Sequence, residues 1–231
     1  QEARFLHELA SWRGQGDKQG ELSTLMSLAE LHLDEHKKED ALREAEEVQK
    51  LACDMRDRER EAEAIRLKIN VYLLDENSNQ AEQMAKEETE RLLKEAPGAG
   101  AARAVLFLAE ADVLTRKGCP REAHKLSEEA LELAKKHGSK RGQAVAAEAV
   151  AANNLALGHS TRALKAAREA LSLYQELGDK RKRAAMLRII ATAHTRAGQG
   201  KEAMDSAYEA HDLCLEVGDR KGEVASLNAV A

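Results

Sequence analysis

The chain has 231 residues, among which Ala, Leu, Glu, Lys and Arg dominate while Pro, Phe, Tyr and Trp are scarce. This mixture favours α-helix throughout and argues against a sheet-based fold, because residues that favour strands are few. The net charge of −5 divides into an acidic part, residues 1–97 with 15 basic and 24 acidic side chains, and a mildly basic part, residues 98–231 with 21 and 17. Because a general nucleic-acid binder needs a contiguous basic face, this division argues against nucleic acid as a partner.

The cysteines predict a reducing compartment such as the cytoplasm. Cys53, Cys119 and Cys214 are far apart, odd in number and form no Cys-x-x-Cys pair, so we expect no disulfide framework. No apolar run approaches the length of a membrane span and no signal peptide is visible, so we expect no direct insertion into a membrane. The chain begins at Gln1 rather than Met, which we interpret as processing or as a piece of a longer protein.

The chain repeats itself with a period of about forty residues. Gly178-Asp179 returns as Gly218-Asp219. Small residues recur in one register, with Ile69 in the equivalent place of the second unit, at Ala29, Ala111, Ala151, Ala191 and Ala231. A second set of alanines lies twelve residues further on, at Ala41, Ala81, Ala123, Ala163 and Ala203, and its steps are 40, 42, 40 and 40. A fixed period of this length predicts one stacked structural unit.

Taken in chain order, the units are predicted as follows. Residues 1–15 are the remnant of a preceding unit's helix, and residues 218–231 form the first helix of a further unit that stops at Ala231 without its partner. Five helix-pair repeats lie between them, at residues 16–55, 56–97, 98–137, 138–177 and 178–217. The whole chain is thus expected to be one solenoid, residues 1–231.

The first two units are less regular than the later ones. His36 and Glu76 stand where later units have a turn glycine. Pro97 cannot continue a helix, because it lacks the backbone N–H. We expect a local change of superhelical pitch at Pro97 rather than a domain boundary.

The last full unit shows the local pattern most clearly. Residues 180–197 carry apolar groups at helical spacing, and Gly198 is expected to end this helix. Residues 201–217 form the second helix in the same way. Gly218 ends that helix, and Asp219 is expected to cap the N-terminus of the next one.

The small first-helix residue, the alanine twelve positions on, and a further alanine seven later (Ala130, Ala170, Ala210) resemble the tetratricopeptide repeat, or TPR. The second helix is longer than in the 34-residue standard unit and ends in Gly-Asp, as in REALSLYQELGDKRKRA. This form is similar to the forty-residue variety of spindle-orientation scaffolds, kinesin light chains and MalT-like regulatory domains. The resemblance implies an all-α fold, a right-handed α-α superhelix of about five helix-pair repeats with partial repeats at both ends.

The resemblance also implies that first helices line a concave groove that binds a partner's peptide or helix. Carried over by register, the groove positions are Met26, Glu30, Arg66, Asn70, Leu73, Leu108, Asp112, Arg116, Glu148, Ala152, Arg188, Thr192 and Arg196. Spindle-orientation scaffolds repeat an asparagine after the small first-helix residue, whereas here only Asn70 occupies that place. The carboxylate clamp of chaperone-binding TPR domains is rejected, because Ala109, Val145 and Ala149 stand where its remaining residues belong.

Basic residues gather at two successive turns between units. They are Lys135, Lys136, Lys140 and Arg141 at one turn, and Lys180, Arg181, Lys182 and Arg183 at the next. Two readings stand: solubilising charge at helix starts, or a basic edge that binds an acidic segment.

Nothing in the sequence predicts catalysis, a metal or a cofactor. His32 and His36 lie one helical turn apart, but His32 shares its repeat position with His194 and Tyr72, which indicates packing, and His36 is expected to be a turn residue. The glycines lie at helix ends rather than in a phosphate-binding loop.

We therefore interpret the chain as a non-catalytic protein–protein interaction scaffold that holds a partner segment in its groove. Two alternatives stay open. The chain is a structural or linker subunit of a larger multiprotein assembly, or it is the regulatory TPR region of a longer signalling protein.

Overall fold

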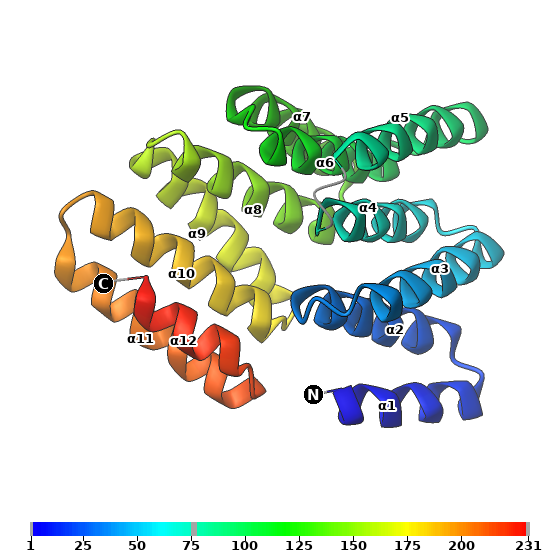
Figure 1. The fold of residues 1–231 in the computed structure, drawn as a ribbon, viewed down its shortest axis with the longest axis horizontal. Coiled ribbons are helices and arrows are strands. Elements are labelled where there is room, and N and C mark those ends of the chain that lie inside the picture. Colours follow the sequence, from blue (N-terminus) through cyan, green and yellow to red (C-terminus); the bar gives the residue numbers. More distant parts are fainter. Residues whose placement is uncertain (1, 75–77, 230–231) are drawn as a thin grey trace. The chain divides into compact units, whose positions relative to one another are not determined.

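The structure is a computed structural model that describes residues 2–74 and 78–229. Within these ranges it contains twelve helices and no strand, so the all-α fold is confirmed (Figure 1). The helices are α1 (Glu2–Gln15), α2 (Lys18–Asp34), α3 (Lys38–Met55), α4 (Arg58–Leu74), α5 (Ser78–Glu95), α6 (Gly100–Arg116), α7 (Pro120–His137), α8 (Lys140–Ala156), α9 (Ser160–Glu176), α10 (Lys180–Arg196), α11 (Gly200–Val217) and α12 (Arg220–Asn228). None of these helices is long and apolar enough to cross a membrane. The expectations for Gln1, Glu76 and Ala231 lie outside the described residues.

The chain divides into two compact units that are each larger than a single repeat, Gln1–Cys119 and Pro120–Ala231. From here on, "unit" means one of these two parts and "repeat" means a helix pair. The division lies between α6 and α7, and therefore inside the repeat expected at residues 98–137 rather than at Pro97. Within each unit, most helices pack against the next helix in sequence. The even-numbered helices also contact one another, α2 with α4 and α4 with α6 in the first unit, and α8 with α10 and α10 with α12 in the second. The first helices of successive repeats therefore form a row within each unit.

Short polar side chains fix where the first helices begin. The Asp219 carboxylate accepts a hydrogen bond from the Gly222 backbone N–H at 2.9 Å, and Asp179 accepts one from Lys182 N–H at 3.0 Å. Asp17, Asp57 and Ser139 accept equivalent bonds in the earlier repeats. Each cap satisfies a backbone donor that has no partner inside the helix and contributes about 1 kcal/mol. The predicted capping role of Asp219 is confirmed.

Left-handed residues end the helices. Gly198 and Gly218 have φ values of 72° and 70°, as the sequence pattern predicts. Where the first repeats lack this glycine, His36 and Arg56 take the same conformation, with φ of 60° and 58°. These two residues are therefore sterically strained, because in this conformation the Cβ lies too close to the following carbonyl oxygen.

The core consists mainly of alanine and leucine. The two alanine sets that revealed the repeat are buried wherever they are described, as at Ala151 and Ala163, both 0% exposed. Small side chains at these contacts allow neighbouring helices to approach closely, because helix spacing depends on the side chains between them. The period thus reflects repeated helix–helix contact points.

Candidate functional site

An ion pair joins the first helices of the second and third repeats. Arg66 of α4 donates from Nε to Asp112 Oδ2 at 2.7 Å and from Nη2 to Asp112 Oδ1 at 3.3 Å. Both side chains are about one-quarter exposed or less. Asn70 lies one helical turn after Arg66 on α4 and is half-buried. The structure therefore brings together Arg66 and Asp112, two of the predicted groove residues. Their charged groups bind each other across the two helices.

Two of the predicted groove arginines cap neighbouring helices. Arg116 of α6 donates from Nη2 to the Leu73 carbonyl in the last turn of α4 at 2.8 Å. Arg196 of α10 donates to the Leu155 carbonyl in the last turn of α8. The two bonds occupy equivalent places in their repeats, and each reaches a carbonyl in the last turn of the preceding first helix, where the intrahelical hydrogen-bond pattern ends. The Leu155 carbonyl also accepts from the Gly158 backbone N–H at 3.1 Å. These guanidinium groups hold successive first helices together.

In the second unit, Glu148 of α8 is the centre of a polar cluster. It accepts a hydrogen bond from the Tyr174 hydroxyl of α9 at 2.5 Å and pairs with Lys182 Nζ of α10 at 3.3 Å. Arg188 lies beside Cys214 of α11. The Thr192 hydroxyl donates to the Arg188 carbonyl within α10 at 2.9 Å. Glu148 therefore links α8, α9 and α10.

Three apolar residues that the repeat register predicts for the groove are buried in the structure. Met26, Leu73 and Leu108 are only 3%, 5% and 0% exposed and belong to the core. They cannot contact a partner without rearrangement. Glu30 is half-buried and Ala152 is exposed.

The residues of the expected basic edge mostly have acidic neighbours. Lys140 pairs with Glu176 and Lys180 with Glu216, each at 2.8 Å and each across the same repeat positions. Lys182 pairs with Glu148, as described above, Arg181 lies 3.9 Å from Asp219, and Lys135 lies 3.0 Å from Glu169. Lys136 is exposed, while Arg141 and Arg183 are half-buried. The net positive charge that this edge presents is therefore smaller than its number of basic residues suggests.

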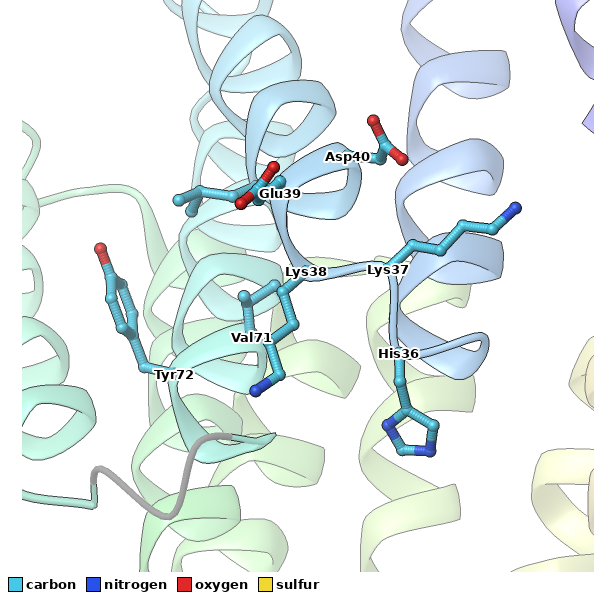
Figure 2. A pocket seen from close by; sticks show the side chains of 8 residues that line it. His36, Lys37, Lys38, Glu39, Asp40, Val71 and Tyr72 are labelled. Atoms are coloured by element: carbon cyan, nitrogen blue, oxygen red, sulfur yellow. The ribbon is translucent and has the colours of Figure 1, made fainter.

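The first unit also contains a cavity that the sequence did not predict. Its volume is about 550 Å³. Figure 2 shows its walls, which come from the α2–α3 turn, the start of α3 and the last turn of α4. It is lined by His36, Lys37, Lys38, Glu39, Asp40, Leu42, Val71 and Tyr72. Lys37 is already paired with Glu2 at 2.7 Å and Glu35 at 2.8 Å, and the lining mixes both signs of charge.

A buried carboxylate, Glu61, was missed by the sequence interpretation. It is 0% exposed and pairs with Arg58 and Arg91, each at 2.7 Å. Burial favours the neutral carboxyl, but the two guanidinium hydrogen bonds outweigh burial and lower the pKa of Glu61. Because Arg91 lies 30 residues away on α5, neighbouring sequence gives no signal of this pairing.

The Cys53 sulfur lies beside Glu61. Partial burial of this sulfur and its hydrogen bond to the Glu61 carboxylate raise the Cys53 pKa to about 11. Although the residue as a whole is exposed, its thiol stays protonated near neutral pH and is a poor nucleophile.

His32 is a packed histidine, as its repeat position predicts. It is 3% exposed, and its Nδ1 lies 2.8 Å from Glu44 Oε2. Burial raises the pKa of Glu44, and the contact with His32 opposes that rise only partly. Within residues 2–74 and 78–229, no three His, Cys, Asp or Glu side chains converge as metal ligands.

Solved structures with the same fold share little sequence with this chain. The crystal structure of BtubC from P. vanneervenii matches with a TM-score of 0.57 and 16% identity over 95% of this chain and 91% of that one. The Rap conjugation gene regulator of plasmid pLS20, in complex with the Phr* peptide, matches with a TM-score of 0.69 and 15% identity over 93% of this chain and 59% of that one. A signal transduction ATPase with a tetratricopeptide repeat sensor, from Pyrococcus horikoshii, matches with a TM-score of 0.53 and 15% identity over 92% of this chain and 36% of that one. At such identities the likeness establishes the fold alone.

Sequence comparison gives the family. No curated protein matches the chain. The family model described as anaphase-promoting complex subunit 5 matches residues 12–68, 101–152 and 143–192, which together cover well over half of the chain. The chain therefore belongs to the anaphase-promoting complex subunit 5 family, and its helix pairs are repeats of the tetratricopeptide type.

Proposed function

We propose that the chain is a non-catalytic protein–protein interaction scaffold that binds a partner segment along its first helices. The observation that carries this proposal is the row of first helices within each unit, where α4 contacts α6 and α8 contacts α10. Polar residues on these helices are held in place by contacts between repeats, Arg66 with Asp112 and Glu148 with Lys182. A pre-positioned polar surface lowers the entropy cost of binding a flexible segment.

The solved structures support a peptide-like partner. The Rap regulator has this fold and was solved with the Phr* peptide bound. For the present chain, the first-helix residues proposed to contact a partner are Arg66, Asn70, Asp112, Arg116, Glu148, Arg188, Thr192 and Arg196. Arg116 and Arg196 would act mainly by holding the helices, since each already binds a carbonyl of the preceding first helix.

Site-directed photo-crosslinking tests the proposal. The photoreactive residue benzoylphenylalanine is placed at Asn70 and Arg188 on first helices, and at the exposed positions Lys125 and Ser172 on second helices as matched controls. We expect crosslinks to a partner from Asn70 and Arg188 and none from the controls. Crosslinks confined to Lys125 and Ser172 would contradict a first-helix site.

Membership of an assembly is the second candidate function. The observation that favours it is the family match itself, because that family is described as a subunit of the anaphase-promoting complex. Native mass spectrometry of the chain purified from its own cells distinguishes the candidates. A large complex of fixed composition indicates a structural subunit. A single bound peptide or protein that is displaced by a competitor for the surface around Arg188 indicates a groove binder.

A further inference from the structure

The second helices of the second unit, α7, α9 and α11, each expose one row of side chains (Figure 1). The row consists of the positions i, i+3, i+7 and i+10, which share one face of a helix. On α11 these residues are Asp205, Tyr208, Asp212 and Leu215, all of them exposed. The buried residues of α11 lie on the opposite face, so the row is the outermost part of the helix.

The row is exposed in the earlier repeats as well. Forty residues before, on α9, the same positions are Lys165, Arg168, Ser172 and Gln175. Forty residues before those, on α7, they are Lys125, Glu128, Glu132 and Lys135. All eight residues are exposed, although α8 packs on α7 and both α8 and α10 pack on α9. The exposure of Tyr208 and Leu215, at 55% and 53%, therefore follows from their place in the repeat.

The charge of the row changes sign between α9 and α11. The α9 row has two basic residues, Lys165 and Arg168, and no acidic one, whereas the α11 row has two acidic residues and no basic one. An adjoining exposed position shows the same contrast, with Arg162 on α9 and Glu202 on α11. The α7 row has two residues of each sign. Within residues 2–74 and 78–229, neither Lys165 nor Arg168 forms an ion pair, and neither does Asp205.

The basic row and the acidic row lie on neighbouring helices. Both α9 and α11 pack on α10. Leu171 of α9 also packs against an apolar cluster that contains Ala210 and Leu213 of α11. One repeat earlier, the ion pair between Lys135 and Glu169 joins α7 to α9 at 3.0 Å. Because equivalent helices of successive repeats run in the same direction, the two rows run in parallel.

We propose that α9 and α11 together form a self-complementary surface, separate from the first-helix site, on which a second copy of this chain binds. A two-fold axis parallel to the two helices and midway between them places α9 of each copy against α11 of the other. Equal repeat positions then oppose one another. Lys165 meets Asp205 of the second copy, and the Arg168 guanidinium meets the Tyr208 ring in a favourable cation–π contact. Each contact occurs twice, because such an interface uses the same patch on both copies.

No like charges of the two rows meet in this arrangement. Ser172 lies opposite Asp212 of the second copy. Lys201, one helical turn before the α11 row, lies opposite the uncharged Thr161. Pairing α9 with α9 and α11 with α11 would instead bring like charges together, which costs free energy. Charge therefore selects the pairing of α9 with α11.

The size of this surface predicts a weak, reversible dimer. The two helices have 17 and 18 residues, so each is about 26 Å long. Two such helices from each copy bury on the order of 1,000 Å² in total, which is near the lower limit for specific interfaces. We therefore expect a Kd on the order of 10 μM at low salt. Salt should weaken the dimer, because it screens exposed ion pairs.

Sedimentation equilibrium of charge variants tests the proposal. Lys165→Asp places two acidic groups opposite each other, twice in the dimer, and should raise the Kd at least about tenfold. Asp205→Lys should do the same. The charge swap Lys165→Asp with Asp205→Lys restores opposite charges and should return the Kd to within about threefold of wild type. Lys125→Asp, the same change at the same position of α7, is the matched control and should alter the Kd by less than about twofold.

Two further measurements accompany the variants. All the substituted positions are exposed, so the circular dichroism spectrum and the Tm of each variant should match those of wild type. Carbodiimide crosslinking of mixed light and heavy isotope-labelled chains locates the contact. We expect mixed-isotope peptides that join Lys165 to Asp205, since only contact between two copies produces them.

Three outcomes overturn the proposal. The first is a wild-type chain that stays monomeric up to about 500 μM at low salt. The second is an equal Kd for Lys165→Asp and Lys125→Asp, or no recovery in the charge swap, which shows that the dimer uses another surface. The third is crosslinking of α9 and α11 to a different protein in chain purified from its own cells, which shows that a partner protein occupies the surface. Photo-crosslinks from Ser172 to a second copy differ in mass from crosslinks to another protein, so this proposal and the first-helix site fail independently.

Discussion

Glu61 is a fully buried carboxylate that forms two ion pairs. It is fully buried between Arg58 of its own helix and Arg91 of α5. A buried carboxylate is tolerable only while both hydrogen-bonding partners are present, because desolvating charge is expensive. The Glu61–Arg91 pair connects α4 to α5, and Arg91 also pairs with Glu88 of its own helix at 2.8 Å.

Glu61→Ala should therefore lower the free energy of unfolding by about 1–3 kcal/mol, the range for hydrogen bonds to charged groups. The loss is limited because Arg58 and Arg91 are about one-third exposed and each keeps another carboxylate partner. Urea unfolding followed by circular dichroism measures the change. The matched control is Glu90→Ala at an exposed position of α5, which should change stability by less than about 0.5 kcal/mol. A loss below about 1 kcal/mol for Glu61→Ala would mean that the pair contributes little.

The pH dependence of stability should distinguish Glu61 from Glu44, because their pKa values move in opposite directions from the ordinary value of 4.5. For Glu61 the folded-state pKa is lowered, so its stabilisation is complete above 4.5 and is lost as pH falls through the folded pKa. For Glu44 the folded-state pKa is raised, so its contribution is present below 4.5 and is lost as pH rises through the folded pKa.

The measurement compares the wild-type chain with Glu61→Gln and Glu44→Gln by urea unfolding between about pH 3 and 7. Glutamine keeps the shape of a protonated glutamate but cannot ionise. The stability advantage of wild type over Glu61→Gln should shrink as pH falls, while its advantage over Glu44→Gln should shrink as pH rises. Parallel curves for both variants would contradict the opposite shifts.

The residues of the candidate site could be predicted from sequence only as positions on helices. Register placed Arg66 and Asp112 on successive first helices, and the structure pairs them. It did not reveal that Arg116 and Arg196 bind carbonyls of the preceding helix, because that contact depends on the spacing between helices and on the direction of a long side chain. Leu108 was predicted to line the groove, but it is buried. Apolar residues that line a groove and apolar residues of the core below it recur with nearly the same spacing, so the sequence pattern does not separate them.

At the scale of helices, the turns of the first repeats have backbone strain that the glycine turns of the later repeats do not have. His36 has φ of 60° where the corresponding turns carry glycine, as at Gly198 with φ of 72°. A residue with a Cβ is strained by about 1–2 kcal/mol in this region. Glycine relieves this strain but gains more freedom in the unfolded chain, which offsets part of the benefit.

His36→Gly should therefore raise the free energy of unfolding by about 0.5–1 kcal/mol. Thermal and urea unfolding measure the change. The neighbouring Glu35 has φ of −83°, so the control Glu35→Gly gains no relief and should lower stability. Destabilisation by both substitutions would show that the His36 side chain makes contacts that exceed its backbone strain.

Helix ends were predictable because they depend on local chemistry. A left-handed glycine followed by a capping Asp, as in Gly218-Asp219, satisfies the end of one helix and the start of the next within a few residues. The division into two compact units after Cys119 was not predictable. The division depends on how closely neighbouring helices pack, which the repeat pattern does not reveal, and Cys119-Pro120 has no linker-like composition.

At the scale of the whole chain, contacts are made between helices close in sequence. α4 packs on α3, α5, α2 and α6, and α8 packs on α7, α9 and α10. In a repeat protein the stability of one region depends mainly on its own helices and on those it touches. Opening of one region can therefore occur without opening of the rest.

Hydrogen exchange followed by mass spectrometry should reveal this local behaviour in two complementary variants. Glu61→Ala should speed exchange in α3, α4 and α5 and leave α10 and α11 nearly unchanged. Asn153→Ala removes the buried hydrogen bond from Asn153 of α8 to Ser127 of α7, 3.0 Å long, and should speed exchange in α7 and α8 but not in α3 to α5. Equal acceleration in all helices by either variant would instead indicate a single cooperative unit, because every amide would then exchange through the same global unfolding.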